Sequence, residues 1–404
     1  MTTNSDQSLL LCGARVVFPQ GAEEQSNLLL KGELIADCRA SHTESSAGAS
    51  HVLDLDGLTI FPGFIDIHIH GAVGVDTMEA GVDGLRKVAN YLASQGVTAW
   101  LPTLVPAPDE DYRRAVLAIE TLMDEQVRAS SSVASGGGGA RVLGVHYEGP
   151  FINAAQCGAL RPPYFQIFRT VADLEKLATL KHEKAAHLIT LAPEIEGGIE
   201  LVRELRRRGF VVSIGHTRAT VETLDAALAA GARHMTHFFN AMAGLHHRQP
   251  GPIGWGLMRD EVTCDIIADG VHTDPLMLEL ALRCKTAGRL MLISDAVAPA
   301  GMGDGDFHIW GETITVKDKR TSNERGSIAG SVISLRDAVW MMLSLGTPAH
   351  DVARMAALNP ARLLGVDAVR GSVAAGKRAD LVALDDEGNV RLTLIGGRVA
   401  FDAR

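Results

Sequence analysis

The chain has 404 residues, of which 46% are hydrophobic and 21% are charged. This length is more than one compact core usually holds, and α/β barrels reach this size class. The formal net charge of -10, without a long basic tract, argues against nucleic acid or an anionic membrane as a main partner. An anionic substrate would therefore need a local positive potential.

Neither a membrane anchor nor a disulfide framework is visible in the sequence. No stretch of about 18 uncharged apolar residues occurs, and the N-terminus lacks the basic, apolar and small-residue order of a secretory signal. We therefore expect a cytoplasmic protein without a membrane partner. The cysteines form no CxxC and no paired pattern, which argues against disulfides and against a zinc–thiolate site. They are Cys12, Cys38, Cys157, Cys264 and Cys284.

The two ends of the chain have similar sequence patterns, with short strand-like runs. Short apolar runs broken by Gly, Ser and Asn precede Pro62, which is typical of antiparallel strands. Near the C-terminus, two further strand-like runs flank a turn at residues 385–389. Because short sheets need partners to be stable, we expect the ends to pair into one small β domain, made of residues 1–61 and 366–404.

Between these ends, strand-like runs alternate with helical patterns, which indicates βα units and a parallel sheet. Amphipathic stretches at 83–96, 109–126 and 219–232 have helical spacing. Eight such units predict a (β/α)8 barrel over residues 62–365. The strand-like runs are 63–70, 98–104, 142–149, 188–194, 210–217, 234–242, 262–272 and 289–297.

Polar residues gather at the C-terminal ends of these runs. Barrel enzymes place their active sites at that end, so one cavity would collect side chains that are distant in sequence. Side chains at i and i+2 of a strand face the same way, so a His-x-His pair can point into the cavity. The residues are His68, His70, Thr103, Glu148, Glu194, His216, His237, Asn240, His272 and Asp295.

Each of these residues also has an ordinary structural interpretation. His68 and His70 could be a hydrogen-bonded pair, Glu148 a salt-bridge partner, and His216 or Asp295 a helix-capping residue. For the site to have no metal, all of these interpretations would have to be true at once. This is unfavourable because each buried polar group left unpaired costs about 1–3 kcal/mol. We therefore predict a metal site with the ligands His68, His70, Glu148, His216, His237 and Asp295.

Imidazole and carboxylate ligands suit zinc, iron(II), manganese or cobalt, whereas calcium would use oxygen alone. A catalytic site leaves one coordination position for water, whose pKa the metal lowers toward about 7. Asp295, on the last strand, is the natural base for that water. His146 shares a face with Glu148 but lies deeper in its strand, so we expect it to pack inside the barrel.

The order of several motifs resembles the N-acetylglucosamine-6-phosphate deacetylase family of the amidohydrolase superfamily. The resemblance covers about residues 57–380. His-x-His alone is weak, whereas HYEGPFIN and THFFNAM in this order are much more specific. The motifs are FPGFIDIHIHG (61–71), HYEGPFIN (146–153), SIGHT (213–217), THFFNAM (236–242), IIADGVH (266–272), SDAVAPAG (294–301) and IAGSVISL (328–335).

The resemblance implies a barrel with a β-sandwich built from both chain ends, and it implies ligand roles. Glu148, His216 and His237 match the main metal ligands of the family, and His68 with His70 match the first-metal histidines of the superfamily. Some family members have replaced those two histidines. Their presence here implies two divalent metals per subunit, zinc foremost and iron, manganese or cobalt as alternatives, with Glu148 bridging.

The resemblance also implies substrate contacts. Asn240 and the backbone at Ala241 match residues that hold a phosphate, and Arg248 matches an arginine that reaches the phosphate from the neighbouring subunit of a dimer. His272 matches a residue that contacts the sugar. Further contacts match the backbone around Ala159, Ile328, Ala329 and Gly330.

One loop departs from the family pattern. After EGPFIN, the family usually has a lysine and a histidine where this chain has Cys157 and Leu160. The contacts of the loop at 154–160 therefore stay open, and so does the choice between an ordinary half-buried thiol and a substrate role for Cys157.

The resemblance implies hydrolysis of the acetamide of N-acetylglucosamine 6-phosphate to glucosamine 6-phosphate and acetate, with Asp295 as general base and then acid. Glu194 and His272 are the next candidates for the base. A dihydroorotase-like cyclic amidase would use the same metals on an unphosphorylated substrate, but Arg248 after the FNAM motif argues against it. A non-catalytic structural relative should have lost ligands, and here all are present.

Overall fold

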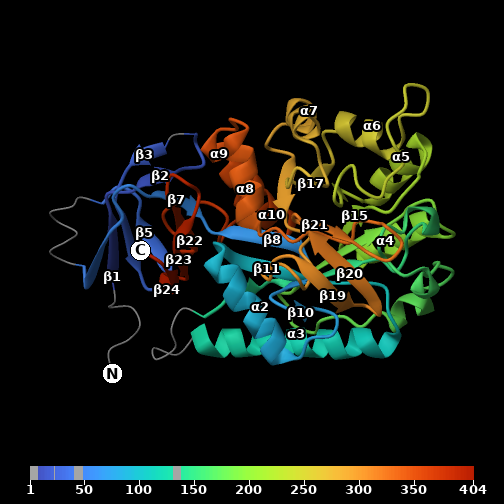
Figure 1. Ribbon diagram of the computed structural model, residues 1–404, viewed down its shortest axis with the longest axis horizontal. Helices are drawn as coiled ribbons and strands as arrows, with labels where there is room; N and C mark the ends of the chain where they lie inside the picture. The colour runs from blue at the N-terminus through green and yellow to red at the C-terminus, as the bar shows by residue number, and fades with distance from the viewer. Residues whose placement is uncertain (1–7, 22, 41–48, 131–137) are drawn as a thin grey trace.

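The computed structural model describes residues 8–21, 23–40, 49–130 and 138–404. Eight of the described strands form a parallel barrel (Figure 1). Each strand pairs with the next, and the ring closes through a parallel bridge between Ile69 and Ala296. The predicted (β/α)8 fold is confirmed. The strands are β8 (Phe64–Ile69), β11 (Val97–Leu104), β13 (Gly144–Glu148), β14 (Ala186–Leu191), β15 (Val211–Ile214), β16 (His234–Met235), β17 (Thr263–Ile267) and β18 (Leu290–Ile293).

Helices surround the barrel and follow the predicted apolar spacing. In the first of them, Leu85, Val88, Ala89 and Leu92 are buried at intervals of three and four residues, so one stripe faces the strands. None of the described helices combines the length and apolar character needed to cross a membrane. The α-helices are α2 (Val82–Ser94), α3 (Asp109–Ser130), α4 (Gly198–Arg207), α5 (Val221–Ala230), α6 (Gly251–Met258), α7 (Pro275–Lys285), α8 (Leu335–Ser344), α9 (Ala349–Ala353) and α10 (Asn359–Leu363).

Local sequence sets several helix ends. Asp274 accepts a hydrogen bond from the Leu276 amide at 2.8 Å, and Pro275 begins α7 where a missing N–H costs nothing. Thr220 caps the start of α5. These caps lie just after the strands that carry the candidate site residues, so they fix where the strand ends turn away from the barrel mouth.

Two βα connections depart from the regular pattern. Short 3-10 helices connect β13 to β14 where a barrel helix would be expected: η1 (Ala154–Gln156), η2 (Pro162–Tyr164) and η3 (Val171–Lys176). After β18, an antiparallel sheet precedes α8; its strands are β19 (Gly305–Ile309), β20 (Glu312–Lys317) and β21 (Arg320–Ser322). Both segments follow C-terminal strand ends, so they can shape the mouth of the barrel.

The chain ends build a second domain at one end of the molecule (Figure 1). One sheet has the order β5-β4-β1-β6, and the other has the order β24-β23-β22-β7-β2-β3, so strands from both termini pair. This confirms the β-sandwich, while its limits at 1–61 and 366–404 stay a prediction. The strands are β1 (Ser8–Cys12), β2 (Arg15–Val17), β3 (Glu23–Gln25), β4 (Leu28–Lys31), β5 (Leu34–Asp37), β6 (His51–Asp54), β7 (Thr59–Pro62), β22 (Leu381–Leu384), β23 (Val390–Ile395) and β24 (Arg398–Asp402).

The sandwich packs directly against the start of the barrel. Gly96, between α2 and β11, has φ of +79°, and a Cβ there would lie 2.7 Å from Val382 Cγ2 and 3.2 Å from the Phe64 ring. Only glycine fits both the left-handed backbone and this close approach. The sandwich therefore covers one end of β8 and leaves the opposite end, where His68 and His70 lie, facing the barrel mouth.

Candidate metal centre and active site

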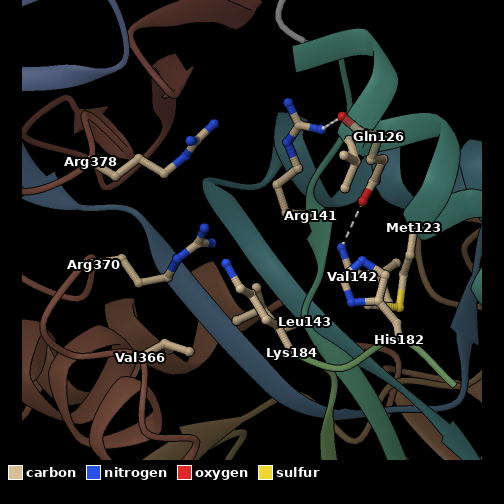
Figure 2. A pocket seen from close by; sticks show the side chains of 11 residues that line it. Met123, Gln126, Arg141, Val142, Leu143, His182, Lys184, Val366, Arg370 and Arg378 are labelled. Carbon is tan, nitrogen blue, oxygen red and sulfur yellow. Dashed lines mark hydrogen bonds between the residues drawn. The ribbon is translucent and has the colours of Figure 1, made fainter. Parts of the chain in front are cut away.

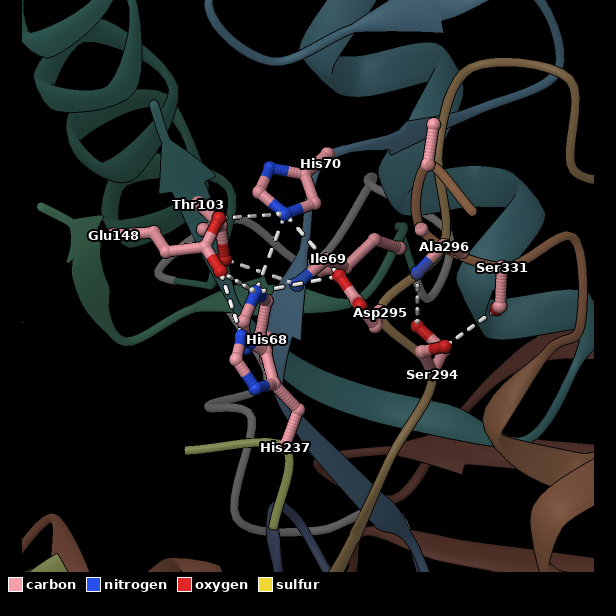
Figure 3. Close-up of polar contacts among 12 residues, drawn as sticks. His68, Ile69, His70, Thr103, Glu148, His237, Ser294, Asp295, Ala296 and Ser331 are labelled. Carbon is pink, nitrogen blue, oxygen red and sulfur yellow. Dashed lines mark hydrogen bonds and ion pairs between the residues drawn. The ribbon is translucent and has the colours of Figure 1, made fainter. Parts of the chain in front are cut away.

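Strand β8 delivers two imidazoles to the C-terminal end of the barrel. His68 Nε2 and His70 Nε2 lie 3.2 Å apart, and they lie 3.6 and 3.4 Å from the two carboxylate oxygens of Glu148 at the end of β13 (Figure 3). Successive side chains of a strand point to opposite faces, so His68 and His70, two residues apart, point to the same face. These three residues form one group whose ligand atoms lie within 4.8 Å of one another.

A second group shares Glu148. His216, after β15, and His237, after β16, both place Nε2 at 3.0 Å from Glu148 Oε1, and their two Nε2 atoms lie 3.1 Å apart. Asp295, after β18, places Oδ1 at 3.3 Å from His68 Nε2 and 3.2 Å from His70 Nε2. The structure thus brings all six predicted ligands together, with Glu148 between two triads.

The donor set fits a divalent cation. Buried imidazole nitrogens 3.1–3.2 Å apart repel one another unless a proton or a metal lies between them. The Nδ1 atom of His216 lies 2.7 Å from the Gln156 carbonyl, which fixes the proton on Nδ1 and leaves Nε2 as a ligand. Tetrahedral or five-coordinate zinc and its neighbours in the first transition row take such nitrogen and oxygen sets.

The pKa values of the groups in this cluster are shifted in different directions. Burial alone would raise the pKa of Glu148, but the surrounding imidazoles, His68 first, hold the pKa well below its ordinary value. Burial lowers the pKa of His68 far below the ordinary value. Burial also opposes the charge on His70, yet its hydrogen bonds to Asp295 and Glu148 raise the pKa of this histidine to about 10. Glu148 is therefore held ionised among the imidazoles that surround it.

Three of the ligand residues have strained backbones. His216, His237 and Asp295 have φ values of 47°, 32° and 49°, in the left-handed region that residues other than glycine rarely adopt. Each follows shortly after a short strand, so the chain turns sharply and directs the side chain inward. Such strain costs on the order of 1–3 kcal/mol per residue and gathers at functional sites.

A cavity of ≈ 430 Å³ opens beside the metal ligands. Its walls include the loop at 155–160 and Trp310, which is at the turn between β19 and β20. The indole N–H of Trp310 donates to Asp76 Oδ2 at 3.0 Å, and its ring meets the His70 ring edge-on at 5.5 Å. The inserted sheet therefore covers one side of the metal centre.

Most residues that the family resemblance assigns to the substrate line this cavity. They are Ala159, Asn240, Ala241, His272, Ile328 and Gly330. Ala329 does not line it, because it is fully buried and its amide donates to Thr321 Oγ1 at 3.1 Å. Gly330 has φ of +59°, and a Cβ there would lie 2.8 Å from the Asp295 carbonyl, so glycine is required behind the ligand.

Arg248 lies outside the cavity. It is on an exposed loop at 244–250, and its guanidinium contacts His247 Nε2 at 2.7 Å. It is therefore not among the residues that line the cavity of its own chain, and its assignment to the phosphate stays a prediction.

Glu194 is engaged elsewhere. Its carboxylate accepts hydrogen bonds from Asn153 Nδ2 at 2.8 Å, Thr217 Oγ1 at 2.6 Å and the Arg218 amide at 2.6 Å. These contacts hold the loop that follows His216 and occupy both carboxylate oxygens. Glu194 thus supports the site from outside it.

Other polar residues stack beneath the ligands. His146 is fully buried between Thr103 Oγ1 at 3.2 Å and Thr190 Oγ1 at 2.8 Å, and burial lowers its pKa to about 3. Asp265 accepts hydrogen bonds from His234 Nε2 at 2.9 Å and from the His237 amide. Sequence reasoning missed Asp265, although its place in a buried strand among apolar residues was a usable signal.

Asp269 is another residue that sequence reasoning missed. Its Oδ2 lies 2.7 Å from His272 Nδ1, and its Oδ1 accepts the His272 amide. This pairing holds His272 at the cavity wall through Nδ1, and none of the described residues forms a hydrogen bond with its Nε2. The spacing of three residues between Asp269 and His272 in one loop was the available signal.

The sequence model of a protein family, described as the amidohydrolase family, matches residues 59–400 of this chain. The chain belongs to the amidohydrolase family. The match spans the barrel and most of the C-terminal part of the sandwich, and it confirms the family membership that the motifs indicate. The family is metal-dependent, and this amidohydrolase has the donor groups for a metal in the two triads around Glu148.

Curated relatives cover nearly the whole of this amidohydrolase. The N-acetylgalactosamine-6-phosphate deacetylase of Escherichia coli O157:H7 is 37% identical over 350 residues, covering 86% of this chain and 89% of the relative. The N-acetylglucosamine-6-phosphate deacetylase of Bacillus subtilis (strain 168) is 34% identical over 345 residues, covering 85% of this chain and 84% of the relative. At these identities, the relatives and this amidohydrolase share one family.

Solved structures agree with the fold of this amidohydrolase. The N-acetylglucosamine-6-phosphate deacetylase of Thermotoga maritima has a TM-score of 0.85 at 31% identity, covering 98% of this chain and 100% of the other. A mutant of the N-acetyl-D-glucosamine-6-phosphate deacetylase of Mycobacterium smegmatis was solved in complex with N-acetyl-D-glucosamine-6-phosphate. It has a TM-score of 0.84 at 28% identity, covering 98% of this chain and 99% of the other.

Proposed function

We propose that this amidohydrolase hydrolyses the acetamide of N-acetylglucosamine 6-phosphate to glucosamine 6-phosphate and acetate. The observation that carries the proposal is the position of Asp295, whose carboxylate lies within 3.3 Å of His68 and His70 Nε2 at the wall of a single cavity. The relatives named as deacetylases of this substrate or of its galactosamine isomer support it. A structural role alone would not require a complete ligand set beside an open cavity.

The chemistry divides between the metal centre and the side chains around it. The two triads would hold a divalent metal, which would supply a Lewis acid for a carbonyl and for water when bound. Asp295 can take a proton from that water and return it to the departing nitrogen, since an amine leaves poorly unless it is protonated. His272, oriented by Asp269, offers Nε2 to the sugar or to the carbonyl oxygen.

The phosphate would lie beside Asn240. This residue lines the cavity, and its buried Nδ2 has no hydrogen-bond partner within the described residues. An amide donor of this kind suits a phosphate oxygen. Arg248 would add the charge, with a planar guanidinium that can hold two phosphate oxygens.

Acetate release tests the proposal. The purified enzyme is given N-acetylglucosamine 6-phosphate, its galactosamine isomer and unphosphorylated N-acetylglucosamine, with Asp295→Asn as the matched control. We expect rapid release from a phosphorylated sugar, slow release from the unphosphorylated one, and little release by the variant. Equal rates on both classes of sugar would favour a different amidase, and no release from any would refute the proposal.

We further propose two divalent metals per subunit, zinc foremost, with iron, manganese or cobalt as alternatives. Support comes from the two triads that share Glu148. Metal analysis of the wild type and of His68→Gln with His70→Asn should show a difference of about one ion per chain, because one triad loses two of its nitrogen ligands. An unchanged metal content would return the pair to a hydrogen-bonding role.

We also propose a homodimer in which Arg248 completes the neighbouring active site. The loop at 244–250 is exposed, Arg248 does not line the cavity of its own chain, and Leu245 on the same loop is 54% exposed. An exposed apolar side chain on the same loop as an arginine suits an interface between copies. Sedimentation velocity should give a dimer, and a monomer at micromolar concentration would refute this arrangement.

A cytoplasmic location is part of the proposal. All five cysteines are unpaired, which is usual in a reducing compartment. Fractionation of the source cells should recover the protein with cytoplasmic markers, and recovery with secreted proteins would contradict it.

A further inference from the structure

A second cavity lies at the opposite end of the barrel from the metal centre. It has a volume of ≈ 200 Å³ and is bounded by the C-terminal half of α3, by β12 (Arg141–Val142), by the segment that leads into β14, and by the segment that leads into β22 (Figure 2). Its apolar floor is formed by Met123, Val127, Val142, Leu143 and Val366.

The polar lining of this cavity is almost entirely cationic. Arg141, Lys184, Arg370 and Arg378 line it together with His182, and no carboxylate does. In Figure 2, Arg370 and Arg378 extend their guanidinium groups into the cavity from one side, and Arg141 lies across from them. This concentration contrasts with a chain whose formal net charge is -10.

Only part of this positive charge is neutralised. Behind the cavity, Asp380 pairs with Arg370 at 3.5 Å and with Arg378 at 3.2 Å, and Glu33 pairs with Arg378. These ion pairs join the N-terminal and C-terminal parts of the sandwich, so they account for the two half-buried arginines. Two carboxylates thus offset Arg370 and Arg378.

Arg141 and Lys184 form no ion pair with any residue that the structure describes, which leaves two positive charges over the cavity. The Arg141 guanidinium donates to the Gln126 carbonyl, but its Nε is buried without a hydrogen-bond partner in the described chain. The same holds for Nδ1 of His182. Buried donors without acceptors are costly and call for a partner.

We propose that this cavity, lined by Arg141, His182, Lys184, Arg370 and Arg378, binds a phosphate group. A phosphate offers several acceptor oxygens and about two negative charges, which matches the two unneutralised cations and the buried N–H groups. The volume is below the 300–1,000 Å³ of pockets for drug-sized ligands, so the occupant is the free ion or a small phosphate ester. This site is independent of the proposed deacetylation.

Equilibrium dialysis with inorganic phosphate at low ionic strength tests the site. The variant Lys184→Glu reverses one charge at an exposed position, so folding should be preserved, and Lys181→Glu makes the same change three residues away outside the cavity. We expect Lys184→Glu to lose about one bound phosphate per chain, or to bind it at least about tenfold more weakly, while Lys181→Glu matches the wild type. Unchanged binding in Lys184→Glu would overturn the proposal.

Two further measurements, a competition experiment and a kinetic comparison, extend this test. Glucose 6-phosphate as a competitor separates the sources of the phosphate group, because displacement from the Lys184-dependent site assigns it to esters and lack of displacement assigns it to the free ion. The kcat/KM for acetate release should be equal in both lysine variants and the wild type, since the metal centre is at the other end of the barrel. Phosphate that is lost in Arg248→Ala but kept in Lys184→Glu belongs to the active site, and would also overturn the proposal.

Discussion

At the metal end of the candidate site, the ligands His68, His70, Glu148, His216, His237 and Asp295 are buried and come from five strands of one chain. At the proposed phosphate end, Asn240 and Ala241 line the cavity, but Arg248 is on an exposed loop, where it contacts its neighbours His246 and His247. One end therefore has its six predicted ligands within a single chain, and at the other end the predicted arginine does not line the cavity.

This difference shows what a barrel can position by itself. Strand ends converge on one rim, so residues far apart in sequence meet there without help from another subunit. A loop that leaves the rim has no such constraint, and it can place a charge only where another surface holds it. The metal end should therefore respond to changes within one chain, and the phosphate end should respond to changes in its partner.

The largest effect is expected for Glu148→Gln. The carboxylate is the only ligand shared by the two triads, and an amide cannot supply two negatively charged oxygens. We expect metal content to fall toward zero and acetate release to fall to background. Glu196→Gln, at an exposed position, is the control. Full metal occupancy in Glu148→Gln would show that the two triads do not share a ligand.

A smaller loss is expected for Asp295→Asn. This change keeps the shape of the side chain but removes its ability to accept a proton, so kcat should fall by about 10²–10⁴. Metal content and KM should change little. Wild-type kcat in a variant that binds metal and substrate normally would move the base to His272, since Glu194 is already held by three donors.

Arg248→Ala should act mainly on KM for the phosphorylated sugar. Loss of a charged hydrogen bond is worth about 1.5–3 kcal/mol, or roughly 10- to 150-fold in kcat/KM. Gln249→Ala, next to it on the same exposed loop, is the control. If Arg248→Ala weakens the reaction of unphosphorylated N-acetylglucosamine by the same factor, the arginine does not bind the phosphate.

Cys157 should show the smallest effect. It lines the cavity, and its thiol donates a weak hydrogen bond to the Gly158 carbonyl at 3.7 Å. Cys157→Ser should therefore change kcat/KM by an amount equivalent to about 0.5 kcal/mol or less. N-ethylmaleimide should inhibit the wild type but not this variant, because the adduct fills the cavity. A large loss in Cys157→Ser would instead give the thiol a substrate role.

The metal end could be predicted from the sequence because strand periodicity fixes it. Two histidines at i and i+2 must share a face, and a strand end in a barrel must point to one rim, so periodicity alone brings His68, His70 and Glu148 together. The left-handed backbones of His216, His237 and Asp295 could not be predicted, because no local pattern marks a non-glycine residue for that conformation.

Tertiary packing decided the remaining differences. The sequence between β13 and β14 forms short 3-10 helices, and no periodicity indicated how the loop at 155–160 and Trp310 would close the cavity. Ala329 matched a substrate contact in the motif, but packing against Thr321 removes it from the cavity. The Arg248 loop is exposed, so no packing within the chain fixes where its guanidinium would act.

Mixing two impaired variants tests most directly whether the site is built from two chains. Asp295→Asn keeps Arg248, and Arg248→Ala keeps Asp295, so a hybrid dimer contains one site with both residues intact if the arginine acts across the interface. After dissociation and reassembly of equal amounts, substrate well below KM should be hydrolysed at about a quarter of the wild-type rate, because half of the dimers are hybrids and each has one complete site. Activity no higher than the average of the two separate variants would contradict the account, since Arg248 would then serve its own chain.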